Sequence, residues 1–128
     1  MLKLFAILLG GGLGALLRYA LFMLAQPPTG SEFPFGTLAA NLLGCLLIGF
    51  LWGNFETVRL SNEWRLFIFT GFLGGLTTFS TLTWETIQLA RADAMRVALL
   101  YLALSNSLGI GLAVTGHTLA RRFPLFGG

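Results

Sequence analysis

Two polar residues stand out within an otherwise apolar stretch of the sequence. Thr37 and Asn41 are four residues apart, so they would lie on one face of a helix. An amide in an apolar environment needs hydrogen-bond partners, and Asn41 carries two N–H donors for them. A structural contact with a neighbouring helix is one use of these donors. Contact with an ion is the other.

Further polar and aromatic side chains recur at helical spacing on two later apolar runs. The set consists of Phe79, Thr81, Glu85, Tyr101 and Ser105, and the apolar Leu82 stands between Phe79 and Glu85 in a series that recurs every third residue. Three helices would thus each present a polar face to the protein interior. A hydrated path is one physical reason to bury so many polar groups in a membrane. Contacts that serve packing alone are the alternative, because Ser and Thr can also bond within their own helix.

The chemistry of these groups favours a small anion. Asn41 supplies N–H donors, and Thr and Ser hydroxyls can turn their hydrogens inward. An interruption near Gly74 and Gly75 would expose backbone N–H groups at a new helix start. The edge of the Phe79 ring is electropositive and could face an anion weakly. Together these donors could replace the water that an anion loses.

Two charged residues within the apolar runs leave alternatives open. Glu85 would repel an anion unless it were protonated, hydrogen-bonded or set to one side, and it could equally be a residue near the membrane interface. Arg18 could reach the surface with its long side chain, or it could form an electropositive vestibule that attracts anions.

The composition indicates that these residues belong to a membrane protein. Of 128 residues, 55% are hydrophobic and only 10% are charged, which is too apolar for an ordinary soluble domain. Four apolar runs cover residues 4–24, 35–55, 64–89 and 97–119. The net charge of +3 does not indicate a nucleic-acid partner, because the basic residues are scattered. We therefore predict a single all-α domain, residues 1–128, of four transmembrane helices in the lipid bilayer.

The third run has an unusual centre. It contains Gly71, Gly74 and Gly75, followed by several hydroxyl residues. Each glycine weakens a helix by about 1 kcal/mol relative to alanine, so we predict that this helix is broken near its middle. Four spans place both termini on one side of the membrane. The distribution of Lys and Arg leans toward cytoplasmic termini, while insertion in both orientations stays open.

Small residues at four-residue spacing predict close contacts between helices. The pairs are Gly10/Gly14, Ala40/Gly44, Gly49/Gly53 and Gly71/Gly75. Such pairs let membrane helices approach closely, because packing drives their association. No nucleophile, base and orienting group assemble from the sequence, so an enzyme is not predicted.

The chain resembles the Fluc/CrcB family of bacterial fluoride channels over its whole length. The resemblance rests on the segments GGLG at 11–14 before Arg18, GTLAANLLG at 36–44 and GGLTTFST at 74–81, and then on Glu85, Tyr101 and Ser105. It implies passive export of cytoplasmic fluoride across the bacterial inner membrane by an antiparallel, dual-topology dimer with two pathways.

The resemblance also implies roles for individual residues. Asn41 and Phe79 would line the ion route, and Arg18 matches the family's first-helix arginine. Backbone carbonyls at Gly74 and Thr77 would hold a structural sodium ion at the dimer centre. The family's polar track is matched by Thr37, Thr81, Glu85, Tyr101 and Ser105.

Two positions depart from the family pattern. Leu82 replaces a second phenylalanine, and Gly109 stands where a serine is common. Leucine has no aromatic edge, so the chain could form a homodimer that conducts more slowly or pair with a different subunit. Two other functions remain as alternatives: a small proton-coupled multidrug exporter with Glu85 as the proton carrier, and a non-conducting assembly partner.

Overall fold

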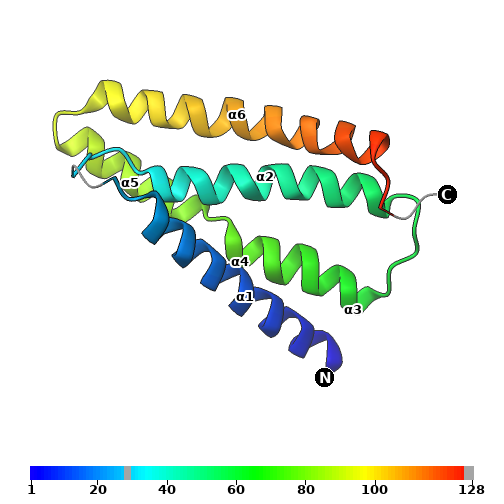
Figure 1. Ribbon diagram of the computed structural model, residues 1–128. Helices are drawn as coiled ribbons and strands as arrows, with labels where there is room; N and C mark the ends of the chain where they lie inside the picture. Colours follow the sequence, from blue (N-terminus) through cyan, green and yellow to red (C-terminus); the bar gives the residue numbers. More distant parts are fainter. Residues whose placement is uncertain (28–29, 126–128) are drawn as a thin grey trace.

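The structure is a computed structural model that describes residues 1–27 and 30–125, where every regular element is a helix (Figure 1). Within that part of the chain, four segments are long and apolar enough to cross a membrane: Leu2–Ala25, Phe35–Phe55, Asn62–Arg91 and Met95–Arg122. The prediction of four spans is therefore confirmed. The second span has the predicted bounds, and the other three extend beyond theirs.

Prolines mark the end of the first helix and the start of the second. α1 (Leu2–Ala25) stops at Gln26, whose backbone is extended because Pro27 follows it. α2 (Phe35–Phe55) starts directly after Pro34. Pro34 occupies the cap position of α2, where its missing N–H is harmless.

The third span consists of several helical segments: α3 (Asn62–Arg65), η1 (Leu66–Leu73), α4 (Gly74–Leu76) and α5 (Phe79–Arg91). The Ser61 hydroxyl caps α3 by accepting a hydrogen bond from the Trp64 N–H. η1 is a π-helix, with one more residue in each hydrogen-bonded turn than an α-helix. Between α4 and α5, Thr77 and Thr78 have extended backbones, with ψ angles of 153° and 117°.

A tight turn leads from α5 into α6 (Met95–Arg122). Asp93 adopts a φ of 56°, in the left-handed region that Asp tolerates better than most residues. The Ala94 N–H then donates to the Leu89 carbonyl at 3.0 Å and closes the turn. α6 runs from Met95 to Arg122 and is longer than the predicted span, 97–119.

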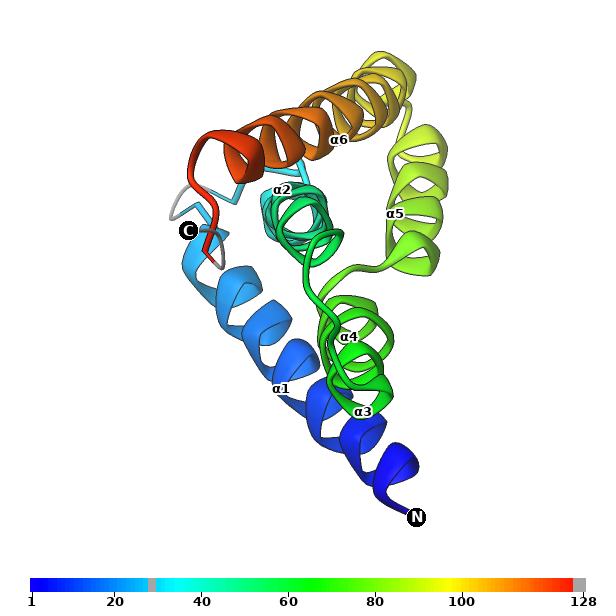
Figure 2. The ribbon, with the colours of Figure 1, turned by 90° about the vertical axis from the view of Figure 1, so that its right-hand side faces the viewer.

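α2 lies at the centre of the molecule. Figure 2 looks along α2 and shows α6, α5, α4 and α1 arranged around it. α6 packs along the length of α2, and α1 packs mainly against η1, with further contacts to α2 and α4. One buried apolar cluster, which includes Ala40, Leu73 and Leu76, joins α2 to η1 and α4. Another, which includes Leu82 and Tyr101, joins α5 to α6.

Glycines allow α1 to contact the third span backbone to backbone. A Cβ on Gly14 would collide with the Phe72 carbonyl and lie 2.8 Å from the Leu76 nitrogen. A Cβ on Gly71 would lie 2.9 Å from the Ile7 carbonyl oxygen. These positions leave no room for a methyl group.

The other predicted small residues pack in the same way. Gly44 faces the Thr77 side chain, Gly49 faces the Ala113 backbone, and Ala40 is fully buried. The prediction of close helix contacts is confirmed.

Candidate functional site

Asn41 is paired with the backbone of Thr78. The Thr78 N–H donates to Asn41 Oδ1 at 2.7 Å, and Asn41 Nδ2 donates to the Thr78 carbonyl at 3.0 Å. The extended backbone of Thr78 lies outside the helical hydrogen-bond pattern. Asn41 of α2 therefore supplies the partners that its N–H and carbonyl groups need. One hydrogen on Asn41 Nδ2 is used by this pair, and the amide carries a second one.

The two extended threonines also use their hydroxyls. Thr77 Oγ1 donates to the Leu73 carbonyl at 2.9 Å, which closes the last turn of the preceding helical segment. Thr78 Oγ1 accepts a hydrogen bond from the Thr81 N–H at 3.3 Å and so caps α5. It also donates to Thr81 Oγ1 at 3.0 Å. The extended segment is thus held from α2 and from both flanking helices.

Glu85 of α5 accepts a hydroxyl hydrogen at each of its carboxylate oxygens. Thr37 Oγ1 of α2 donates to Oε1 at 2.8 Å, and Tyr101 Oη of α6 donates to Oε2 at 2.7 Å. Thr37 is only 3% exposed and Tyr101 is fully buried, so both donors are fixed by packing. Each hydroxyl has one hydrogen, and here that hydrogen goes to Glu85.

A cavity of about 400 Å³ opens beside the Asn41–Thr78 pair. Its lining includes Asn41, Phe79, Leu82 and Ser105, which come from α2, α5 and α6. Phe79 is 80% exposed, whereas Leu82 is 6% exposed. Ser105 Oγ is buried without a hydrogen-bond partner in the part of the chain that the structure describes. The wall therefore combines an amide, a free hydroxyl and an exposed ring.

Arg18 lines a different cavity, of about 290 Å³. Thr37, Thr78 and Thr81 share its lining, so the guanidinium side chain lies on a wall rich in hydroxyl groups. Because Thr78 lines both cavities, the extended segment separates the two. Positive charge on one side and N–H and O–H donors on both are suited to an anion.

Comparison with known proteins identifies the family. The family model described as "CrcB-like protein, Camphor Resistance (CrcB)" matches residues 5–117. The chain belongs to the CrcB-like family. With its four apolar helices it is a multi-pass membrane protein of the bacterial inner membrane.

Two CrcB relatives are similar over almost the whole chain. A protein of Desulfotalea psychrophila is 46% identical over 120 residues, which is 94% of this chain and 93% of the relative. One of Salinibacter ruber is 50% identical over 119 residues, which is 91% of this chain and 87% of the relative. Both are named fluoride-specific ion channel FluC.

Within this CrcB chain, the predicted site residues fall into three neighbouring groups. Asn41, Phe79, Leu82 and Ser105 share the larger cavity with Gly74 and Thr77. Arg18 and Thr81 lie at the smaller one. The third group is Thr37, Glu85 and Tyr101, which are joined by hydrogen bonds.

One residue of this CrcB site was missed from the sequence. Thr78 was noted only as part of a motif, although it bonds Asn41, caps α5 and lines both cavities. The available signal was that threonine is a common helix N-cap and that Thr78 stands directly before residues with helical spacing. The sequence does not show that its backbone would pair with an amide 37 positions earlier.

Proposed function

We propose that the protein is a subunit of a fluoride-selective channel that lets fluoride leave the cytoplasm passively. The single observation that carries this function is the similarity, over about nine-tenths of the chain, to relatives named fluoride-specific ion channel. The family assignment favours a channel over the proton-coupled exporter, and over an enzyme. Hydrogen-bond donors line both cavities of the candidate site, in agreement with that function.

Asn41 is proposed to contact the ion directly. Its second Nδ2 hydrogen is free of the Thr78 pair, and the side chain lines the larger cavity together with Phe79 and Ser105. The unpartnered Ser105 hydroxyl can turn its hydrogen toward an anion. Phe79 offers the electropositive edge of its ring. Leu82 fills the wall at the next turn without such an edge.

Glu85 is proposed to stand beside the path rather than within it. Its charge is stabilised by Thr37 and Tyr101, which donate one hydrogen bond to each oxygen. These two hydroxyls therefore position Glu85 and have no second hydrogen for fluoride. Arg18 and Thr81, at the smaller cavity, form the positively charged approach.

The path is proposed to be completed by a second subunit in an antiparallel, dual-topology dimer. Phe79 and Gly74 are exposed at the larger cavity, and so is the polar Asn106 on the same wall. An exposed amide in the middle of a membrane helix is costly unless a protein partner or water covers it. A second copy satisfies this need, and a different subunit that supplies the second phenylalanine would do so as well.

A structural sodium ion at the dimer centre is proposed on the same basis. α4 ends at Leu76, and the Thr78 N–H bonds Asn41, so it does not bond the Gly74 carbonyl as it would in a continuous helix. The carbonyls at Gly74 and Thr77 therefore suit a hard monovalent cation. A sodium ion bound there would supply positive charge that joins the two subunits across this segment.

The test is fluoride efflux from liposomes that contain only this protein. Fluoride release without chloride release is expected for a homodimer. A lack of fluoride release by the pure protein, restored when a second family member is added, would instead show that it works as a heterodimer. Equal release of both ions, or silence in both conditions, would contradict the proposed function.

A further inference from the structure

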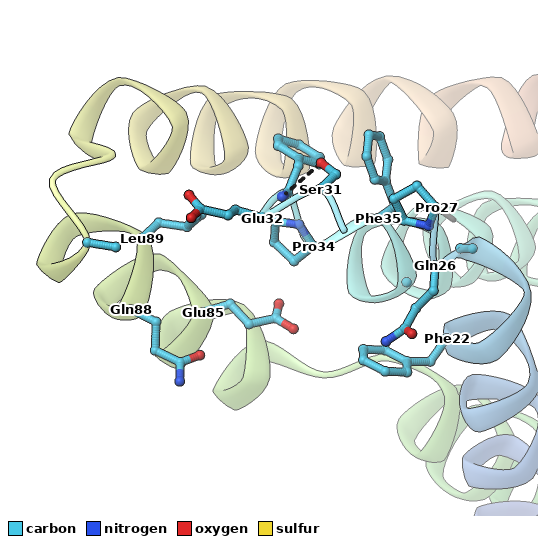
Figure 3. Close-up of a pocket in the computed structure, with 14 residues that line it drawn as sticks. Phe22, Gln26, Pro27, Ser31, Glu32, Pro34, Phe35, Glu85, Gln88 and Leu89 are labelled. Carbon is cyan, nitrogen blue, oxygen red and sulfur yellow. Dashed lines mark hydrogen bonds between the residues drawn. The ribbon is translucent and has the colours of Figure 1, made fainter. Parts of the chain in front are cut away.

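A third cavity, of about 410 Å³, lies where the end of α1, the segment before α2 and the end of α5 meet (Figure 3). Its volume is within the range of small-molecule sites. Figure 3 shows Phe22 on α1, Glu32 on the connecting segment and Glu85 on α5 among its lining residues. Phe33 and Phe35 complete an aromatic part of the wall.

Two of the aromatic side chains that line this cavity are partly exposed. Phe22 is 38% exposed and Phe35 is 44% exposed. Phe33 and Phe35 form a tilted pair with ring centroids 4.7 Å apart, and Phe33 also meets the edge of Tyr101. Ring faces attract organic cations, and several rings around one site are typical of quaternary ammonium recognition.

The charge of the cavity has the complementary sign. Glu32 and Glu85 are both carboxylates, and the described lining residues include no Lys, Arg or His. The hydrogen bonds that Glu85 accepts come from hydroxyls, which carry no net charge. The described lining therefore combines two carboxylates with aromatic side chains and contains no basic residue.

At the opposite end of the molecule, a similar set of aromatic and acidic side chains already contacts a cation of the chain itself. There a smaller cavity, of about 120 Å³, is lined by Trp52, Phe55 and Glu56, and Arg65 is part of the same wall. The Arg65 guanidinium carbon lies 5.7 Å from the centroid of a Trp52 ring. At that end the chain supplies the cation itself.

We propose that the third cavity binds a small organic ammonium ion, with its charge beside Glu32 and Glu85 and its alkyl groups on Phe22 and Phe35. The ammonium group could belong to a free metabolite or to the headgroup of a membrane lipid. This site goes beyond the proposed function and does not depend on it, because binding is measured without fluoride.

The test is a calorimetric titration of the full-length protein in nanodiscs made only of phosphatidylglycerol, which contains no ammonium group. Choline is compared with 3,3-dimethylbutan-1-ol, which has the same shape and no charge. We expect saturable choline binding and at least tenfold weaker binding of the alcohol. Equal binding of the two compounds, or no choline binding, would overturn the proposal.

Variants locate the bound choline. Glu32→Gln and Phe35→Leu, both at exposed residues, are each expected to weaken choline binding about fivefold. Glu56→Gln is the matched control, since it removes an exposed carboxylate at the other end of the molecule. Unchanged affinity in both cavity variants, or an equal loss in the control, would contradict this location.

A second arm identifies the source of the ammonium group. The choline titration is repeated in nanodiscs that contain phosphatidylethanolamine. A lower apparent affinity for choline there supports a lipid headgroup as the occupant, because the lipid competes for the cavity. An unchanged affinity supports a free ammonium compound at the same site.

Discussion

Asn41 and Thr78 hold each other through two hydrogen bonds, one in each direction, although they are 37 positions apart. The pair fixes α2 to the only two residues with extended backbones inside the third span as described, Thr77 and Thr78. The second Nδ2 hydrogen of Asn41 takes no part in this pair and can be donated to another acceptor. The same side chain is thus both a structural link and the proposed ion contact.

Asn41→Asp is expected to reduce fluoride efflux by about tenfold or more. The change removes both N–H donors and sets a carboxylate against the Thr78 carbonyl and the passing anion, and hydrogen bonds to charged groups contribute about 1.5–3 kcal/mol. Liposome efflux measures the loss, and size-exclusion chromatography checks that the assembled protein remains. Asn62→Asp adds the same charge at the exposed start of α3 and should leave efflux unchanged. Normal efflux in the Asn41 variant would remove this residue from the route.

Tyr101→Phe and Glu85→Gln are expected to be energetically coupled. Tyr101→Phe removes the donor of the 2.7 Å hydrogen bond between these side chains, and Glu85→Gln removes the charge of its acceptor. The second change should therefore cost less than the first. We expect a coupling free energy of about 1 kcal/mol or more in a double-mutant cycle of unfolding in detergent. Thr83→Val and Glu85→Gln form the control cycle, because the Thr83 hydroxyl donates to the Phe79 carbonyl of its own helix and, among the described residues, bonds no other helix. Strict additivity of the Tyr101 and Glu85 changes would speak against the hydrogen bond.

Gly14→Ala is expected to destabilise the protein by about 1–3 kcal/mol, because the new methyl group meets the backbone of Phe72 and Leu76. Gly12→Ala is the matched control on the same helix, since nothing lies within 4 Å of a Cβ there. It should be neutral or stabilise the helix by up to about 1 kcal/mol. Thermal unfolding in one detergent compares the two variants. Equal melting temperatures would argue against the close contact of α1 with the third span.

Phe79→Leu and Leu82→Ala are expected to separate conduction from packing. Phe79 is 80% exposed and its loss should lower fluoride efflux while the fold of the chain remains. Leu82 is buried against Leu89, Ala98 and Tyr101, so Leu82→Ala should cost about 2–5 kcal/mol of stability. Efflux and thermal unfolding are measured on both variants. The reverse pattern would show that Phe79 serves packing and Leu82 the path.

The four spans could be predicted from the sequence because each is a predominantly apolar run of sufficient length. The bounds of 35–55 were predicted to the residue, since Pro34 and the polar loop after Phe55 leave little choice. The glycine contacts were also predictable, because four-residue spacing of small residues is characteristic of membrane helix packing.

The pairing of polar groups could not be predicted. Asn41 was assigned donors without a partner, and Glu85 was left with several roles, because the sequence does not show which hydroxyls meet it. The π-helical turns of η1 were not predicted either, because an apolar run such as Leu66–Leu73 fits an α-helix as well as a π-helix. Contacts between distant segments decide the partners of Asn41 and Glu85.

The contact between α1 and η1 bears on how the chain is made. α1 leaves the ribosome first, with Gly10 and Gly14 on a surface that fits backbone and no side chain. Its main partner is η1, which is synthesised only after α2 is complete. Until then this surface of α1 lacks its main partner. We therefore expect α1 to settle into its final tilt late in biosynthesis, and a nascent chain halted before Leu66 to hold α1 loosely.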